Sequence, residues 1–351
     1  MRKLFLGMAS LALLFSSCDN EKSTITPSQE IDMSNFSVYT PDAELTAKPT
    51  DGKSNTKTCY SMNVLNRQLQ ENPGLEQKMY AIEYQTRKYI AGKGKPSGGG
   101  GGGGNTDPDV DVLPIADNLG TINIPVNIII VYPDASTVTQ SQIDTQMATL
   151  NDDFVNPHTD QLPSGTTFAN DATNAGFSFT VAGVYRYNDP TSSWGTNDAV
   201  KAAYPPISPE THLNIWVCNI GGGILGYAQF PGGAPETDGV VIGGPYFGTT
   251  SGVYGLGRTA THEIGHYLNL RHIWGDGPCR FDDYVVDTPD ASASNGGCPT
   301  FPSVSCKSAD MTMNYMDYTY DACMYMFTDG QRNRMRAIFQ PGGARAALVG
   351  N

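Results

Sequence analysis

Eleven residues of the chain, HEIGHYLNLRH from His262 to His272, have the composition of a catalytic metal site. They hold three of the five histidines in the sequence, and Glu263 directly follows the first one. On a helix, residues four apart project from the same face, so His262 and His266 can present two imidazole nitrogens to one ion. Three neutral imidazoles suit Zn²⁺ and leave a fourth position open to water, which is the pattern of a catalytic zinc.

Glu263 has a chemical role beside such an ion. A carboxylate next to the bound water can take its proton while the water attacks a polarised carbonyl, so we predict that Glu263 is the general base. A purely structural zinc site does not need this carboxylate. Although HExxH alone arises by chance in long chains, a third histidine at the right spacing makes a chance match rare.

The third ligand, His272, requires the helix to end before it. His272 lies six residues after His266, which is about a turn and two-thirds further along a continuing helix. Sites of this kind usually carry glycine three residues after the second histidine, where a positive φ makes the turn. Here the residue is Asn269, and asparagine is the non-glycine residue that best tolerates the left-handed region. We therefore expect Asn269 to make the turn at modest cost.

The segments that must position this motif alternate between strand and helix patterns. Residues 122–133 are strongly β-forming, with Val126, Ile128 and Ile130 alternating, and residues 141–154 carry apolar side chains at helical spacing. Further strand candidates are residues 176–187, 212–220 and 238–244. This order predicts an α/β or α+β layer in which the motif helix backs a sheet.

The N-terminus predicts export. Two cations, Arg2 and Lys3, precede a short apolar run, which is typical of a signal peptide over residues 1–17. The small residues before Cys18 resemble a bacterial lipobox, which would place a lipid on Cys18 and attach the chain to a membrane at the cell envelope. The alternative is cleavage nearby with soluble secretion. No other segment is long and apolar enough to cross a membrane.

Composition limits the partners and divides the chain. The formal net charge of −13 argues against nucleic acid as the main partner, because phosphate backbones require clustered Lys and Arg. Residues 18–57 are polar and predict a disordered tether. In residues 58–92, Asn72 and Pro73 predict the start of a helix within a small helical pro-segment.

A glycine-rich linker, residues 93–107, separates this segment from a catalytic domain over residues 108–351. Seven consecutive glycines, 98–104, favour an exposed, flexible chain. The linker is either an ordinary interdomain connection or a hinge that is cut to release the mature domain.

HEIGHYLNLRH, followed downstream by MTMNYMDYTYDACMYMFTDGQRNRM (residues 311–335), resembles the metzincin metallopeptidases, specifically the pappalysin branch that contains the cytophagalysins. The resemblance covers most of the chain after the linker. It implies an α+β, metzincin-like catalytic domain with a twisted, mainly parallel sheet, an antiparallel edge strand and backing helices. It also implies a zinc helix, a Met-turn and a C-terminal helix. We expect polypeptide substrates and a monomer.

The resemblance assigns roles to residues of the Met-turn region. Met316 would be the Met-turn methionine beneath the zinc. Tyr318 matches a tyrosine that stabilises the oxyanion, a role that suits a phenolic donor. The alternative is that Tyr318 is one of several tyrosines that pack this loop.

Four cysteines follow the motif, and in an exported protein an even cluster indicates disulfides with three possible connectivities. The resemblance implies that Cys279 pairs with Cys306 and Cys298 with Cys323. The acidic loop between Cys279 and Cys298 offers hard oxygen ligands of the kind that Ca²⁺ prefers. The resemblance also implies calcium here, because relatives bind it in this region. These candidate ligands are Asp283, Asp287 and Thr288. The alternative is a solvated acidic loop.

Cys59 resembles a pro-segment cysteine that caps the zinc as thiolate and keeps the enzyme latent, because a thiolate is a good fourth ligand that blocks water. The alternatives are a disulfide between Cys59 and Cys218, or two unrelated thiols with Cys218 buried in its strand.

Substrate preference has a weaker pattern. Several relatives cut before Arg or Lys and use acidic residues just before the last cysteine to bind that side chain. Here Asp321 is present, which predicts a substrate-binding residue and a preference for Arg or Lys directly after the cut, but Ala322 directly precedes Cys323 and departs from the pattern. We interpret the chain as an exported zinc endopeptidase made as a latent zymogen. The alternatives are an inactive, zinc-containing surface binding lipoprotein and a zinc amidase acting on small or cell-wall peptides.

Overall fold

The computed structural model describes residues 30–40, 59–93 and 112–350. The chain divides into two compact units, residues 1–30 and 31–351, and only Glu30 of the first unit is described. The predicted signal peptide, Cys18 with its lipid, and the seven glycines of the linker lie outside the described residues. None of the described helices is long and apolar enough to cross a membrane.

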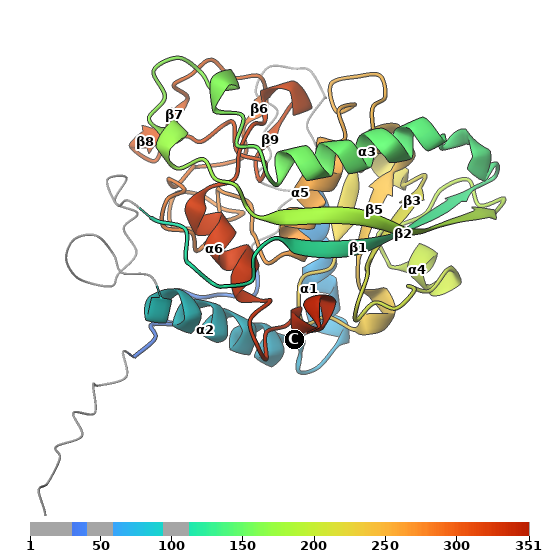
Figure 1. Ribbon diagram of the computed structural model, residues 1–351, viewed down its shortest axis with the longest axis horizontal. Coiled ribbons are helices and arrows are strands. Elements are labelled where there is room, and N and C mark those ends of the chain that lie inside the picture. Colours follow the sequence, from blue (N-terminus) through green and yellow to red (C-terminus); the bar gives the residue numbers. More distant parts are fainter. Residues whose placement is uncertain (1–29, 41–58, 94–111, 351) are drawn as a thin grey trace, which may run out of the picture. The chain divides into compact units, whose positions relative to one another are not determined.

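The described residues of the larger unit form six α-helices and nine strands (Figure 1). The helices are α1 (Ser61–Glu71), α2 (Leu75–Lys93), α3 (Gln140–Asp153), α4 (Ala199–Ala203), α5 (Arg258–Tyr267) and α6 (Asp329–Ala337). The strands are β1 (Ile122–Tyr132), β2 (Phe177–Asn188), β3 (Leu213–Cys218), β4 (Gly226–Ala228), β5 (Val240–Gly243), β6 (Gly296–Gly297), β7 (Val304–Ser305), β8 (Ser308–Ala309) and β9 (Tyr318–Thr319).

The main sheet has five strands in the order β2-β1-β3-β5-β4. The pairs β1–β2, β1–β3 and β3–β5 are parallel, whereas β4 pairs antiparallel with β5 at one edge. This arrangement confirms the predicted α+β fold with a mainly parallel sheet and an antiparallel edge strand. Because β4 is the edge strand, its outer side pairs with no other strand of the sheet, and Cys59 forms an isolated parallel β-bridge with Gly226 there.

The alternation of apolar residues along β1 explains how the sheet is covered on both faces. Val126, Ile128 and Ile130 face one apolar cluster, which also contains buried side chains of α3 and α5. Ile129 and Val131 face a second cluster, which includes side chains of α1 and α4. Because successive strand residues point to opposite faces, an almost continuous apolar run is what a strand covered on both sides requires.

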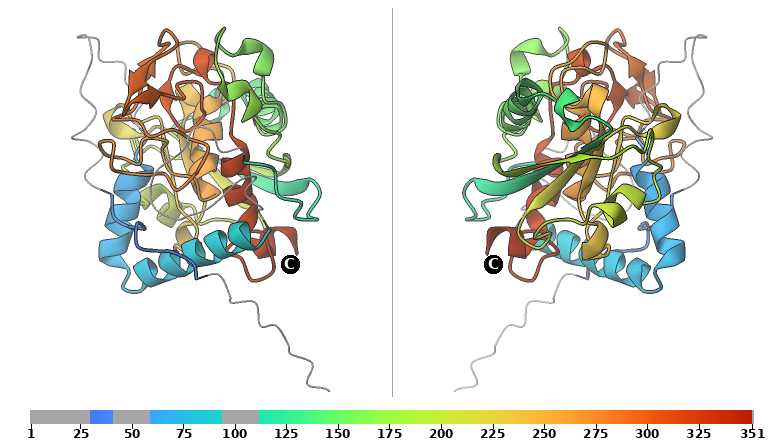
Figure 2. Two further views of the ribbon diagram at one scale, coloured as in Figure 1. Left: turned by 90° about the vertical axis from the view of Figure 1, so that its left-hand side faces the viewer. Right: turned by 90° about the vertical axis from the view of Figure 1, so that its right-hand side faces the viewer.

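Residues 59–93, here called the N-terminal helical segment, form two helices rather than one. Asn72 was predicted to begin a helix, but it caps the end of α1, with its backbone N–H and its side chain both bonded to the Gln68 carbonyl. The second helix begins at Leu75. Figure 2 shows α1 and α2 running in different directions along the outside of the sheet region, residues 112–350.

Residues 30–40 differ from the predicted disordered tether. Val38 is buried in a cluster with side chains of α1 and α2, and Phe36 packs against Tyr80 and Tyr284. This stretch is mostly polar, which is why its composition predicts disorder. Its apolar residues Phe36 and Val38 nevertheless pack against other parts of the fold. The prediction of disorder is therefore wrong for this part of residues 18–57.

Candidate metal centre

The motif helix ends where its chemistry requires. Helix α5 terminates at Tyr267, and Asn269 has φ of 77°, in the left-handed region. The Leu270 N–H then bonds back to the Gly265 carbonyl at 2.9 Å, which is the pattern of a left-handed helix end. The predicted turn at Asn269 is confirmed, and it carries His272 back toward the other two histidines.

The three imidazoles converge with the same ring atom facing inward. Each Nδ1 lies beside an oxygen that can only accept: the Tyr315 carbonyl for His262 at 2.7 Å, and the Leu270 carbonyl for His266 at 2.8 Å. For His272 the partner is an Asp276 carboxylate oxygen at 2.5 Å. The Nδ1 atoms therefore carry the protons, which leaves the Nε2 lone pairs for a common ligand.

The inward nitrogens fit a cation. The Nε2 atoms of His266 and His272 lie 3.1 Å apart, and two lone pairs at this separation repel each other unless a cation or proton lies between them. All three histidines are completely buried. A metal ion held by three such nitrogens would keep a further coordination position open.

The Met-turn lies directly against this helix. A Cβ at Gly265 would lie 2.3 Å from the Met316 sulfur, so only glycine allows this approach. Tyr318, on β9, stacks edge-on against His272, with ring centroids 4.9 Å apart. Burial, together with nearby acidic groups, raises the pKa of Tyr318 well above its ordinary value, so its phenol remains a hydrogen-bond donor.

The N-terminal helical segment enters this centre. The Cys59 sulfur and one ring nitrogen from each histidine lie within 4.8 Å of one another. Ser61 Oγ donates to Glu263 Oε2 at 2.7 Å, and the Tyr318 hydroxyl donates to the Cys59 carbonyl at 3.3 Å. Sequence reasoning singled out Cys59 but missed Ser61, whose only signal is its position two residues later.

Comparison with known proteins identifies the family. The family model described as peptidase M43, pregnancy-associated plasma protein-A, matches residues 197–340. An extracellular metalloprotease of Neurospora crassa is 34% identical over 227 residues, covering 60% of this chain and 71% of that protein. The chain belongs to the peptidase M43 metalloprotease family.

Other relatives agree with this assignment. An extracellular metalloprotease of Arthroderma benhamiae is 36% identical over 171 residues, covering 46% of this chain and 63% of its own length. The chain thus spans less than two-thirds of the first curated relatives. Mature mirolysin of Tannerella forsythia with a cleaved peptide has a TM-score of 0.63 at 42% identity, covering 66% of this chain and 96% of that structure. A promirolysin mutant has a TM-score of 0.68 at 35% identity, covering 84% and 97%.

Two carboxylates hold the beginning of the M43 motif helix. Asp321 Oδ2 accepts from the backbone N–H groups of Leu256 and Arg258 at 2.9 and 3.2 Å, and Asp321 is completely buried. This structural position differs from the predicted contact with a substrate side chain. Asp153, which sequence reasoning missed, accepts from Thr261 Oγ1 at 2.7 Å and Tyr315 Oη at 2.9 Å.

The cysteines of this M43 chain are paired as the resemblance implies. Disulfides join Cys279 to Cys306 and Cys298 to Cys323. Cys59 and Cys218 are both buried and free, so the alternative disulfide between them is not formed.

The predicted calcium ligands have protein partners. Both Asp283 carboxylate oxygens accept from Thr288 Oγ1 at 2.9 Å. Asp287 instead accepts from Thr328 Oγ1 at 2.7 Å and from the Gly330 N–H at 2.8 Å, at the beginning of α6. Burial raises the pKa of Asp287 to about 7. Within the described residues, neither carboxylate belongs to a converging group of three or more His, Cys, Asp or Glu side chains, and calcium binding stays a prediction.

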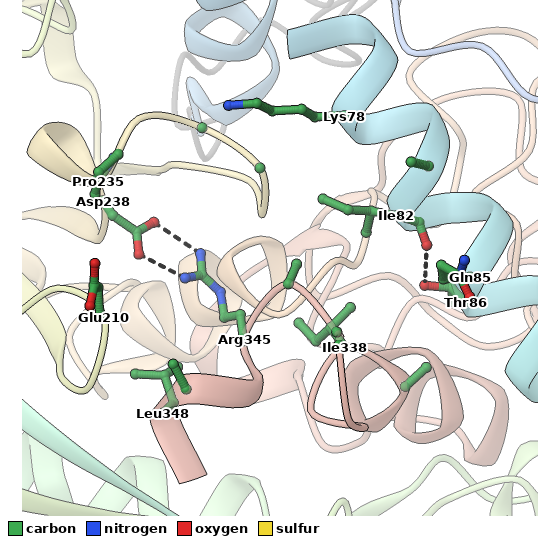
Figure 3. A pocket seen from close by; sticks show the side chains of 18 of the residues that line it. Lys78, Ile82, Gln85, Thr86, Glu210, Pro235, Asp238, Ile338, Arg345 and Leu348 are labelled. Atoms are coloured by element: carbon green, nitrogen blue, oxygen red, sulfur yellow. Dashed lines mark hydrogen bonds and ion pairs between the residues drawn. The ribbon is translucent and has the colours of Figure 1, made fainter. Parts of the chain in front are cut away.

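A separate cavity of about 480 Å³ lies between α2 and the C-terminal residues (Figure 3). Asp238 and Arg345 form an ion pair on its wall, with oxygen–nitrogen distances of 2.7 and 3.0 Å. None of the three converging histidines lines it. Because α2 forms one wall, this cavity exists only while the N-terminal helical segment stays in place.

Proposed function

We propose that the chain is the latent precursor of an exported, zinc-dependent endopeptidase. The observation that carries this proposal is the set of three inward Nε2 atoms with Glu263 beside them and Cys59 facing the same point. Membership of the M43 family and the extracellular relatives support it.

Each residue of the site has a separate role in the proposed reaction. His262, His266 and His272 would hold a zinc ion, which would supply Lewis acidity to activate a water and polarise the carbonyl that the water attacks. Glu263 then accepts the proton that the attacking water loses and delivers it to the leaving amine. The Tyr318 phenol donates to the oxygen of the attacked carbonyl as negative charge develops there.

The outer edge of β4 favours a polypeptide substrate. The N-terminal helical segment already uses this edge: Tyr60 N–H donates to the Gly226 carbonyl at 3.2 Å, and Ala228 N–H donates to Ser61 Oγ at 2.7 Å. An extended peptide can take over these backbone bonds as an added strand. A small-amide substrate would leave most of the edge unused.

Latency follows from two contacts of the same segment. Cys59 faces the position where water would bind, and Ser61 occupies the carboxylate of Glu263. The backbone of Cys59 also pairs with that of Gly226 on β4, as a parallel β-bridge, next to these two contacts. The similarity to promirolysin covers 84% of the chain, against 66% for mature mirolysin, and this difference supports assigning the added part to a pro-segment.

Hydrolysis of a denatured protein tests the activity. The full chain is loaded with zinc, converted by limited digestion with a second protease that is then removed, and assayed with and without chelator beside Glu263→Ala. Chelator-sensitive cleavage that Glu263→Ala lacks is the expected result. If folded, zinc-loaded protein cuts nothing and Glu263→Ala changes nothing, the binding-lipoprotein alternative takes its place.

Latency is tested on the undigested chain. Cys59→Ala, alone or combined with Ser61→Ala, is expected to cleave substrate without processing. Cys218→Ala removes the other buried free thiol and is the matched control, which stays silent. A Cys59→Ala chain as silent as this control would contradict the role of Cys59.

A further inference from the structure

A second part of the N-terminal helical segment contacts the sheet region beyond the end of β4. The Arg67 guanidinium lies 2.5 Å from Asp198 Oδ2 and donates to the Thr196 carbonyl at 3.4 Å. The next residue, Gln68, donates to Gln229 Oε1 at 2.9 Å. Two neighbouring polar side chains of α1 are thus inserted among acceptors of the sheet region.

The acceptors also have partners within the sheet region. Asp198 precedes α4, and its other oxygen lies 3.1 Å from Lys201 Nζ. Lys201 is completely buried and also donates to the Thr237 carbonyl at 2.7 Å. Thr237 Oγ1 in turn donates to Gln229 Oε1 at 2.6 Å. These contacts lie within the sheet region and hold one Asp198 oxygen toward α1.

Lys201 favours the ionised form of Asp198 from within the sheet region. Burial alone would raise the pKa of Asp198, but the charges of Lys201 and Arg67 outweigh it and lower the pKa. Lys201 remains when the segment is removed, whereas Oδ2 loses the Arg67 guanidinium.

The contacts of α1 relate this acceptor to the catalytic carboxylate and to the end of β4. Ser61, which contacts Glu263, and Arg67 are six residues apart on one helix, or ~9 Å along its axis. Gln229 directly follows Ala228, the last residue of β4. At ~3.3 Å per residue, an extended peptide on this edge reaches the site about three residues from the scissile bond.

We propose that Asp198 and the Thr196 carbonyl form a guanidinium-binding subsite of the processed enzyme, which selects arginine about three residues from the cut. The inference rests on the proposed endopeptidase function. The site lies past the C-terminal end of β4, so a peptide that runs antiparallel to β4 brings an arginine on the N-terminal side of the scissile bond. Arginine is the expected side chain because a guanidinium fills this position in the precursor, where one Arg67 nitrogen contacts both the Asp198 carboxylate and the Thr196 carbonyl.

Matched peptides test this subsite. A peptide that the processed enzyme cuts is resynthesised with Arg, Lys or Gln three residues before the bond. With wild-type enzyme, kcat/KM for the Arg peptide should exceed that for Gln by roughly tenfold or more, which corresponds to one charge-assisted hydrogen bond. In Asp198→Asn the ratio should fall to about one. Asp144→Asn, an exposed carboxylate on α3, should leave the ratio unchanged.

A binding measurement separates failure of the subsite from failure of catalysis. The same peptides are titrated against processed, zinc-loaded Glu263→Ala protein by calorimetry, which requires no cleavage. Tighter binding of the Arg peptide that Asp198→Asn abolishes supports the subsite even if no variant hydrolyses peptides. Equal affinities or equal rates for Arg and Gln in otherwise wild-type protein overturn it, and this comparison stands even if Asp198→Asn does not fold.

Discussion

Glu83→Gln should release the N-terminal helical segment from the sheet region. Glu83 on α2 and Arg334 on α6 form a two-point ion pair, with oxygen–nitrogen distances of 2.7 and 3.0 Å. Their side chains are 2% and 3% exposed, and Arg87 also contacts Glu83 at 2.7 Å. Glutamine keeps the shape of the side chain but leaves the Arg334 charge buried without its partner.

The pKa of Glu83 sets the magnitude. Burial alone would raise this pKa, but the charges of and hydrogen bonds from Arg334 and then Arg87 outweigh burial and lower it from 4.5 to about 2. A change of this size corresponds to ~3 kcal/mol in total, of which only the Arg334 share contributes to docking because Arg87 stays beside Glu83 on α2. Breaking a buried pair costs ~3–5 kcal/mol in general. The docked pKa is depressed, so this stabilisation is present above pH ~4.5 and is lost as pH falls toward ~2.

The assay uses precursor nicked in the linker, in which only non-covalent contacts hold the segment. Dissociation of the segment is followed by size-exclusion chromatography or calorimetry at pH 7 and again at lower pH. Glu83→Gln should weaken binding more than ~100-fold at pH 7, and its difference from wild type should shrink below pH ~4.5. Glu76→Gln makes the same change at an exposed position of α2. If both variants retain the segment equally, the buried pair does not hold it.

Two further substitutions probe the metal centre directly. Asn269→Ala places at φ of 77° a residue that tolerates the left-handed region less well than asparagine, and it should lower the free energy of unfolding by ~1–2 kcal/mol. Asn269→Gly should stay close to wild type in thermal denaturation. An alanine variant as stable as the glycine variant would remove the conformational explanation. Asp276→Asn takes the carboxylate from His272 Nδ1 and should weaken zinc affinity by ~10–100-fold in competition with a coloured chelator. Unchanged affinity would show that the ring needs no such partner.

Local patterns were sufficient to predict individual elements of the sheet region, whereas the mainly parallel sheet came from the family resemblance. The alternation in residues 122–133 and the helical spacing in residues 141–154 correspond to β1 and α3, because burial imposes these periods on the sequence itself. Asn269 was predictable for a similar reason, since the distance from His266 to His272 allows only a helix end between them. In each case the decisive constraint acts within a few residues.

The sequence alone did not predict the contacts between segments that lie far apart in the chain. Ser61 lies 202 residues before Glu263, and Asp153 lies 108 residues before Thr261, so no local spacing reveals either contact. Asp321 was misplaced because its position near Cys323 says nothing about which way its carboxylate points. Asn72 suits the end of one helix as well as the beginning of the next, and only the apolar packing of α1 decides between them.

The contacts of the N-terminal helical segment differ in what can replace them. On the proposals above, Ser61 and Arg67 occupy groups that a substrate also uses, at the β4 edge and at Asp198, so a peptide competes with them directly. Glu83 binds Arg334 on α6, a contact that does not involve β4. Substrate can therefore displace the α1 contacts while the α2 anchor keeps the segment attached. Lasting activation then requires loss of the Glu83–Arg334 pair. A segment that is still anchored at α2 rebinds the metal centre and the β4 edge at high effective concentration.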